Sequence, residues 1–198
     1  MYQKKFQQFL QNDGTIDFYF RINCFVKKDF VILDLGAGRA EWYEDDTIRC
    51  RRSLRTLKGK CKKIIAADTS FSVKQNNSVD SSVVINPNEA LPFEDGSFDL
   101  IIADYVLEHI ENPKSFVTEI DRLLKTGGLF AARTPHKFSY VAIFSRLVKN
   151  KYHSKILKYV QPHRKEIDVF PTRYKLNSLK KFDLLFQNFY IQICDQNS

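Results

Sequence analysis

Short apolar runs, each followed by turn-forming or acidic residues, recur along the chain between residues 31 and 132. The run at 31–35 is too short for a globular helix. Its β-branched residues, with glycines directly after it, favour a fully buried strand. Similar runs predict four further strands, at 63–68, 81–85, 99–104 and 129–132.

One stretch repeats apolar residues at helical spacing instead. After Pro113, apolar side chains recur at i, i+1, i+4, i+7 and i+8, which gives one apolar helix face (Phe116, Val117, Ile120, Leu123 and Leu124). Thr126-Gly127-Gly128 is expected to end this helix with a left-handed glycine. Further helices are predicted at 1–12, 138–148 and 176–186 and a sixth strand at 188–194, whereas 16–26 fits a strand or a helix.

The strand at 31–35 leads into a glycine turn that runs from Asp34 to Gly38, and Arg39 to Tyr43 can start a helix after it. A strand, a glycine turn and a helix form a nucleotide-binding corner, because glycines allow a sharp turn and no Cβ blocks a ligand on the main chain. We therefore expect Gly36, Ala37 and Gly38 to contact a ligand through their backbone.

The charges around this turn favour a cationic ligand. A dinucleotide fingerprint would place a third small residue where the chain has Glu41, and a carboxylate repels a pyrophosphate. S-adenosylmethionine (SAM) has no phosphate, and its sulfonium and amino groups are cationic, so it suits Asp34 and Glu41. A further acid, Asp68, ends the strand at 63–68, where nucleotide-binding α/β folds bind ribose hydroxyls.

Two further motifs complete a resemblance to a known family. Leu91-Pro-Phe-Glu-Asp-Gly-Ser-Phe-Asp99 leads into the strand at 99–104, and Leu107-Glu-His-Ile110 follows it. Together with the glycine turn, these motifs resemble the class I SAM-dependent methyltransferases over about residues 31–135. The resemblance implies an α/β fold, a Rossmann-like three-layer αβα sandwich with a mostly parallel sheet, and SAM as the cofactor. The family normally adds an antiparallel hairpin strand after the sixth strand, and we expect this sheet to be shortened at that C-terminal hairpin.

The resemblance also implies roles for residues beyond the glycine turn. Asn88 and Glu89, in the loop after the third strand, would contact the adenine, and Thr69, directly after Asp68, would also contact the cofactor. At the end of the fourth strand, Asp104 would face the methyl-transfer site and Tyr105 would cover the adenosine. His109 in this motif more often caps and packs a loop than acts in catalysis. No catalytic residue and no metal site are assigned.

The chain departs from the family pattern in two ways. The third glycine of the turn is replaced by Ala40, which adds one methyl group. The stretch between Asp34 of the glycine turn and Asp68 at the end of the second strand is longer than the roughly twenty residues usual between these two motifs. We therefore expect the first helix to carry an extra stretch at 45–52 before Leu54 and Leu57 return to the core.

Residues after the fifth strand are expected to select the acceptor, because insertions there commonly form the acceptor lid in methyltransferases and long loops on a rigid scaffold tend to carry substrate choice. Four residues are predicted to border the acceptor: His153, His163, Arg164 and Tyr174. His136 could act as a base for a hydroxyl acceptor, although an ordinary surface histidine is the plainer interpretation.

Length and composition indicate one folded domain of 198 residues, because 43% hydrophobic and 14% aromatic residues exclude a disordered chain. We divide it into an N-terminal cap (1–28), a SAM-binding core (29–136) and an acceptor lid with the terminal helix and strand (137–198). No apolar run approaches the ~18 residues of a membrane span and no signal peptide is evident, which predicts a cytoplasmic protein. The scattered cysteines are predicted to be free thiols.

The net charge of +8 is unevenly distributed. Basic residues without any acid fill the stretch between Asp46 and Asp68, and a second such stretch runs from Arg146 to Lys165. These stretches could attract an acidic substrate, nucleic acid or an anionic membrane surface. Solvated faces of ordinary helices are the plainer interpretation, since aromatic residues are not interleaved with the basic ones.

The function predicted from the sequence is methyl transfer from SAM to an unidentified acceptor, a small molecule or an acidic one. Two alternatives remain open, a non-catalytic SAM-binding partner protein and an RNA methyltransferase. Glu41 and the downstream motifs argue against a nucleotide-dependent oxidoreductase. The sequence makes no prediction of the oligomeric state.

Overall fold

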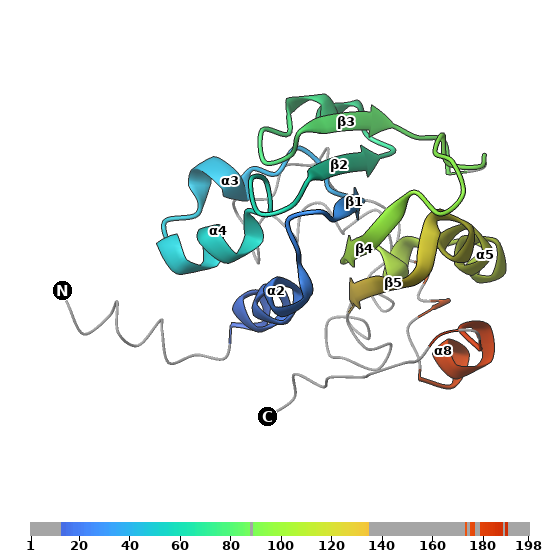
Figure 1. Ribbon diagram of the computed structural model, residues 1–198. Coiled ribbons are helices and arrows are strands. Elements are labelled where there is room, and N and C mark those ends of the chain that lie inside the picture. The colour runs from blue at the N-terminus through green and yellow to red at the C-terminus, as the bar shows by residue number, and fades with distance from the viewer. Residues whose placement is uncertain are drawn as a thin grey trace, which may run out of the picture.

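The computed structural model describes residues 13–87, 89–134, 173, 175–176, 179–187 and 189. Figure 1 shows the elements in chain order: α2 (Gly14–Phe25), β1 (Val31–Leu35), α3 (Trp42–Asp45), α4 (Arg49–Arg55), β2 (Lys63–Asp68), η1 (Phe71–Gln75), β3 (Ser81–Val84), β4 (Phe98–Asp104), η2 (Leu107–His109), α5 (Pro113–Leu123), β5 (Leu124–Arg133) and α8 (Leu179–Leu185). The η elements are 3₁₀ turns.

The five strands of the described residues form one parallel sheet in the order β3-β2-β1-β4-β5. The first strand in the sequence lies at its centre, with β2 on one side and β4 on the other. Because all strands run in the same direction, their carboxyl ends lie along the same edge of the sheet. Ligands of open α/β folds bind at this edge.

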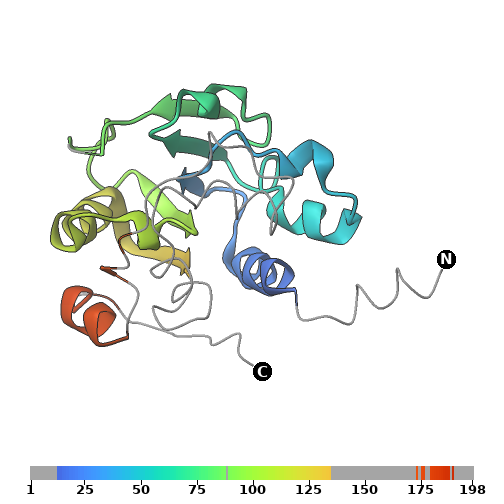
Figure 2. The same ribbon diagram turned by 180° about the vertical axis from the view of Figure 1, so that it is seen from behind.

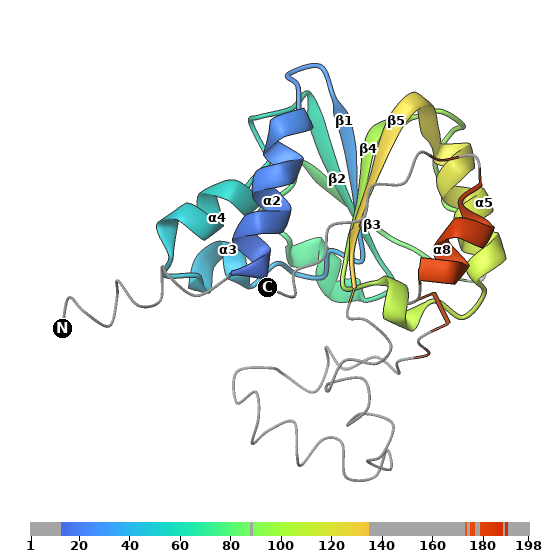
Figure 3. The ribbon, with the colours of Figure 1, turned by 90° about the horizontal axis from the view of Figure 1, so that it is seen from below.

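Helices cover both faces of the sheet (Figures 2 and 3). Helices α2, α3 and α4 lie on one face, and α5 and α8 lie on the other. Successive residues of β1 serve opposite layers, since Ile32 belongs to the core cluster under α2 and Leu33 to the cluster under α5. The predicted three-layer α/β sandwich with a parallel sheet is therefore confirmed.

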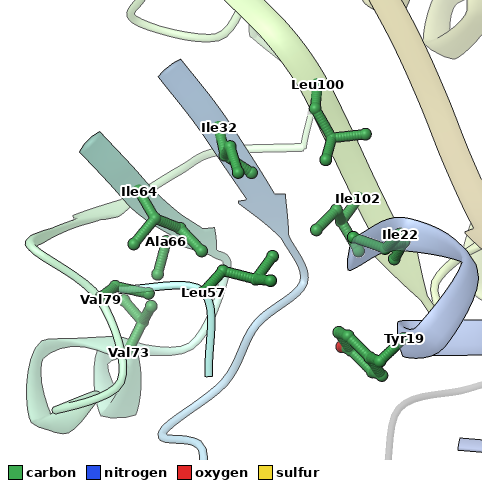
Figure 4. Close-up of a cluster of buried hydrophobic side chains, with 10 residues drawn as sticks. All are labelled: Tyr19, Ile22, Ile32, Leu57, Ile64, Ala66, Val73, Val79, Leu100 and Ile102. Atoms are coloured by element: carbon green, nitrogen blue, oxygen red, sulfur yellow. The ribbon is translucent and has the colours of Figure 1, made fainter. Parts of the chain in front are cut away.

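The segment at 16–26, which the sequence left open, is helical. Asp13 caps the helix, because its carboxylate accepts hydrogen bonds from the backbone N–H groups of Thr15 and Ile16. Figure 4 shows Tyr19 and Ile22 of this helix in the apolar cluster on the sheet. Helix α2 is thus fixed beside the carboxyl edge of the sheet.

The expected single first helix with an extra stretch at 45–52 is wrong, because the chain forms two short helices there, α3 and α4. Asp46 separates the two helices. Its carboxylate accepts a hydrogen bond from the backbone N–H of Ile48 and forms an ion pair with Arg51. The expected return to the core does occur, because Leu57 is buried and Leu54 packs against the same cluster.

The expected glycine stop after α5 is also wrong. The helix ends at Leu123, and Leu124 is already extended, with φ −75° and ψ 140°. Strand β5 starts there, five residues before the strand predicted at 129–132, and its register on β4 shifts between Phe98 and Leu100. Gly127, with φ +79°, lies within this irregular part of the strand, so that it shapes a bulge and not a helix end.

Several predicted elements lie outside the described residues: the helices at 1–12 and 138–148 and, apart from residue 189, the strand at 188–194. Helix α8 agrees with the helix predicted at 176–186. None of the helices that the structure describes is both long and apolar enough to span a bilayer.

Candidate cofactor site

The glycine turn after β1 takes a backbone path that L-residues rarely adopt. Gly36 and Gly38 have φ angles of +72° and +53°. A Cβ on Gly36 would overlap Cγ2 of Val106, while the N–H of Gly36 donates to the carbonyl of Ala67 at 2.7 Å. Ala40 also has a positive φ, +54°, so the residue that replaces the family's third glycine carries strain.

Asp68 joins the end of β2 to this turn. Its buried carboxylate accepts hydrogen bonds from the backbone N–H of Gly38 at 2.9 Å and from that of Ser70 at 2.7 Å. Asn76, which sequence reasoning missed, donates to the carbonyl of Gly38 at 3.1 Å. The structure thus brings the predicted ribose acid and the predicted glycine turn together.

Asp34 lies at the carboxyl end of β1 in a different environment. Burial raises the pKa of its carboxyl to about 7, the carboxylates of Asp104 and Asp68 add to the increase, and the charge of Arg55 opposes it. Its contacts with the described residues are electrostatic, and none of the hydrogen bonds among them ends on this carboxylate. Asp34 is therefore a partly buried acid whose acceptor oxygens remain for another group.

Asp104 ends β4 and is fully engaged by protein side chains. Arg133 at the end of β5 donates from Nε to Oδ1 at 2.7 Å and from Nη2 to Oδ2 at 2.8 Å. The hydroxyl of Tyr19 donates to Oδ2 at 3.3 Å. The side chains of this ion pair are only 11% and 12% exposed. Asp104 thus lies at the predicted edge of the sheet, with both oxygens occupied.

Arg133 links several elements at this end of the sheet, and sequence reasoning missed it. Its Nη1 donates to the hydroxyl of Thr15 at 3.0 Å, and its guanidinium lies over the rings of Phe18 and Tyr105. Tyr105 has a φ of +59°, and its side chain is half exposed. The signal that could have identified Arg133 is its place as a basic residue at the end of the fifth strand.

Arg55 of α4 is the second cation that sequence reasoning missed as a site residue, because it was grouped with the basic stretch. Its guanidinium lies 4.2 Å from the ring centre of Trp42 and 5.5 Å from that of Tyr19. Its charge lowers the pKa of Asp34. Three helices therefore contribute side chains to one charged and aromatic group at the carboxyl edge.

The remaining predicted cofactor residues have fewer contacts. Thr69 is exposed directly after β2, and Ala37 packs against the core cluster under α2. Glu89 is exposed in the loop after β3, where its carboxylate accepts a hydrogen bond from Asn86 at 2.7 Å. Asn88 lies outside the described residues, as do the predicted acceptor residues His136, His153, His163, Arg164 and Tyr174.

The motif at 107–110 has a packing role. Leu107 is completely buried, and Glu108 is buried with a carboxylate that accepts a hydrogen bond from the Thr134 hydroxyl at 3.0 Å. Burial raises the pKa of Glu108. The backbone N–H of His109 donates to the carbonyl of Val106 in the 3₁₀ turn η2, and the capping role of its side chain stays a prediction.

Glu41, whose charge was expected to favour a cation, forms an ion pair with Arg39. Both side chains line a cavity of about 310 Å³ that adjoins the turn at Ala40 and extends to Gln75 and Asn77. Of these two acids of the corner, Asp34 and not Glu41 is therefore the one without an ion pair among the described residues. Within the described ranges, no three His, Cys, Asp or Glu side chains form a group that could hold a metal ion.

Comparison with known proteins identifies the domain. Residues 50–132 match the family model described as a methyltransferase domain. An uncharacterised protein of Methanocaldococcus jannaschii is 31% identical over 119 residues, which cover 58% of this chain and 45% of that protein. A probable SAM-dependent methyltransferase of Mycolicibacterium smegmatis is 36% identical over 50 residues, 25% of this chain and 20% of the relative. The matched segments thus span less than half the length of these relatives.

The fold is shared with solved structures. The YcgJ protein of Bacillus subtilis superposes with a TM-score of 0.56 at 18% identity, over 88% of this chain and 66% of that one. Residues 50–132 therefore form a methyltransferase domain, a segment of the chain is similar to a probable SAM-dependent methyltransferase, and the solved structure shows the same fold.

Proposed function

We propose that the chain transfers a methyl group from SAM to an acceptor that is a small molecule or carries acidic groups. The observation that supports this most is the state of Asp34. A carboxylate that is partly buried against a ligand-binding turn, without a hydrogen-bond donor among the described residues, favours a cationic ligand. The sulfonium and ammonium groups of SAM are such cations.

The proposal assigns the cofactor contacts as follows. The backbone of the turn, Gly36 to Gly38, would lie against the donor, Asp34 would face its cationic end, and Asp68 would accept from the ribose hydroxyls. The adenine would lie near Thr69, Asn88 and Glu89, and the adenosine would be bordered by Asp104 and Tyr105. In the domain, residues 29–136 form the SAM-binding core, between a cap (1–28) and an acceptor lid (137–198).

When bound, SAM supplies an electrophilic methyl group whose leaving group is a neutral thioether. The chain's own part is to orient the two reactants and exclude water, an effect that reaches ~7–11 kcal/mol in well-aligned systems. Asp34 and Asp68 fix one reactant at the edge of the sheet. A base is needed only where the acceptor must lose a proton, and Arg133 keeps Asp104 occupied by an ion pair. The proposal therefore assigns no base among the described residues.

Several cations of the basic stretch before Asp68 have structural partners. Lys58 donates to the carbonyl of Val79 at 2.8 Å, and Lys60 donates to that of Ser53 at 2.6 Å. Arg51 forms ion pairs with Asp13 at 2.8 Å and with Asp46 at 2.6 Å. Since these charges stabilise the fold around α4, the observations favour a small-molecule acceptor over RNA. A cytoplasmic location is part of the proposal, in line with the free thiols of Cys24, Cys50 and Cys61.

A non-catalytic SAM-binding protein is the second candidate. It is favoured by one observation, that Arg133 and Tyr19 occupy both oxygens of Asp104 at the place where the acceptor would approach. The two candidates differ in turnover and not in SAM binding.

Two measurements test the proposal. Isothermal calorimetry with SAM and with NADH separates a methyl donor site from a dinucleotide site, and we expect binding of SAM alone. Transfer of radiolabelled methyl groups to a cell extract, fractionated into RNA, protein, lipid and small molecules, then identifies the acceptor class. We expect label in the small-molecule fraction. Tight SAM binding without any label supports the second candidate, and label in RNA contradicts the small-molecule acceptor.

A further inference from the structure

Asn76 is a buried amide that follows the 3₁₀ turn η1 and contacts the glycine turn. Its Nδ2 group donates to the carbonyl of Gly38 at 3.1 Å. Its Oδ1 accepts from the backbone N–H of Ser78 at 3.0 Å and from the hydroxyl of Ser78 at 2.7 Å. Because a backbone N–H can only donate, the contact with Ser78 identifies the oxygen of the amide and places the nitrogen at Gly38. The amide thus has a protein partner at both of its ends.

Gly38 is bound by Asp68 as well. The N–H of Gly38 donates to Oδ2 of Asp68 at 2.9 Å, and Ser70 donates its backbone N–H to Oδ1 at 2.7 Å. Gly38 has a φ of +53°, and a Cβ at this position would lie in open space. Since a glycine without crowding neighbours can adopt many conformations, side-chain packing does not restrict this residue. The hydrogen bonds to Asp68 and from Asn76 therefore hold the Gly38 backbone in place.

The backbone contacts of Asp68 leave acceptor positions for a ligand. A carboxylate has about four lone-pair positions, and the N–H groups of Gly38 and Ser70 occupy one on each oxygen. Each oxygen can therefore accept one more hydrogen bond, and a ribose offers two neighbouring hydroxyl donors. The direction of the remaining positions depends on the orientation of the carboxylate, which the N–H of Gly38 helps to set. Rotation of the Gly38 backbone would turn these positions away from the ribose.

We propose that Asn76 is a positioning residue of the donor site. Its hydrogen bond to the carbonyl of Gly38 fixes the backbone whose N–H orients Asp68, and so keeps Asp68 ready to accept from both ribose hydroxyls. This inference rests on the proposed function, because it assumes that Asp68 binds the ribose of SAM. Asn76 acts through Gly38, since both ends of its buried amide are engaged by protein groups. A preformed acceptor loses less freedom on binding than one that the ligand must order.

Calorimetric titration of the full chain with S-adenosylhomocysteine and with its 2′-deoxy analogue measures the ribose contact, because the two ligands differ by one hydroxyl. We expect the wild-type chain to bind the intact ligand about 10- to 100-fold more tightly, the range of a hydrogen bond to a charged group. In Asn76→Ala this preference falls to about threefold or less, because the Gly38 carbonyl loses its donor and Asp68 loses its fixed orientation.

Ser78→Ala is the matched control. It removes a hydrogen bond of 2.7 Å from the same amide at a position that is also buried, but it leaves the contact between Asn76 and Gly38 intact. We expect this variant to unfold at a lower temperature than the wild type and to keep the preference for the intact ribose. A role of Asn76 in stability alone would instead leave the preference unchanged in both variants.

The ratio of two affinities measured on one protein is insensitive to a fraction of unfolded chain. If Asn76→Ala does not fold, Asn76→Asp takes its place. Its carboxylate still accepts from Ser78 but offers no donor to Gly38, so its preference is expected to lie below that of the wild type.

A preference that survives in the Asn76 variant overturns the inference. An equal loss in Ser78→Ala also overturns it, because the loss would then come from general loosening of this segment and not from Gly38. Equal binding of the two ligands by the wild type overturns it as well, since Asp68 would not distinguish the ribose hydroxyls. Failure of the wild type to bind either ligand contradicts the proposed function itself.

Discussion

Two charged regions lie along the carboxyl edge of the sheet, and they differ in how their charges are paired. At the ends of β4 and β5, Asp104 and Arg133 form a two-bond ion pair that Tyr19 completes. At the end of β1, the charge of Arg55 opposes the rise in the pKa of Asp34, but neither side chain makes a hydrogen bond with a described residue. The first region holds α2 on the sheet, whereas the second retains binding capacity for a ligand.

The different pairing of the two regions distinguishes a ligand site from a structural ion pair in a fold that many functions share. An enclosed charge with a partner stabilises the structure, and an enclosed charge without one costs free energy that only a function explains. By this criterion the cationic groups of the donor belong at Asp34, and Asp104 mainly positions α2.

The largest expected effect on stability comes from loss of the ion pair between Asp104 and Arg133. Replacing Arg133 by Met leaves Asp104 enclosed without its cation, which should lower the free energy of unfolding by about 3–5 kcal/mol. Urea unfolding followed by circular dichroism measures this. The double variant with Asp104→Asn should recover part of the loss, since it removes the uncompensated charge. If Arg133→Met lowered the free energy of unfolding equally in the wild-type and the Asp104→Asn background, the stabilising role of this ion pair would be contradicted.

The next largest effect on stability is expected in the glycine turn, against which the methyl donor is proposed to lie. Gly36→Ala should cost about 2–4 kcal/mol, because the residue has a left-handed φ and the new methyl group overlaps Val106. Thermal unfolding measures the change. The control is Gly59→Ala, which has a positive φ of +80° but open space around the Cβ, and which should cost less. Equal costs would show that the overlap with Val106 is unimportant.

Asp34→Asn should stabilise the free protein at pH 8 by about 1–3 kcal/mol, because it removes a charge that burial disfavours. The folded pKa of about 7 lies above the ordinary 3.8, so wild-type stability falls as pH rises from about 4 to 7 and is level above that. The advantage of the variant should therefore be smaller at pH 5 than at pH 8 and should vanish below about pH 4. Urea unfolding at pH 5 and pH 8 measures the difference.

Asp68→Asn is the matched control for that variant. It should destabilise the protein instead, since an amide cannot accept both N–H groups that Asp68 binds.

The affinity of the wild-type protein for SAM should fall when the pH is lowered from 8 to 6. Asp34, with a pKa of about 7, becomes protonated over this range and loses the charge that is proposed to bind the cationic groups of SAM. Unchanged affinity over this range would contradict the role of the Asp34 charge.

The smallest expected effect is at Ala40. Ala40→Gly should stabilise the chain by about 1 kcal/mol, because glycine adopts the φ of +54° without the steric cost that alanine bears. Thermal unfolding measures the shift. A decrease in stability would mean that the methyl group of Ala40, which is buried, contributes more by packing than its backbone costs.

The parts of the structure that depend on local pattern could be predicted from the sequence. The strands, the glycine turn and the meeting of Gly38 with Asp68 follow from short apolar runs and from the common edge of parallel strands. The division of the first helix into α3 and α4 could not be predicted, because it depends on a turn at Asp46 and its ion pair with Arg51.

The two site arginines could not be predicted for a related reason. Arg133 binds Asp104 and Thr15, which lie 29 and 118 positions away in the sequence. Arg55 was hidden in a run of basic residues, and only the packing of Trp42 and Tyr19 distinguishes it from its neighbours. Partners so distant leave no periodic signal in the chain.

The most direct test of the proposed donor site is a crystal structure of the chain with S-adenosylhomocysteine, the product that keeps the donor's adenosyl and amino-acid groups. We expect the ribose at Asp68, the backbone of the glycine turn beneath the ligand, and the ammonium of the amino-acid end at Asp34. A ligand bound elsewhere, or an amino-acid end turned toward Asp104 and Arg133, would contradict it.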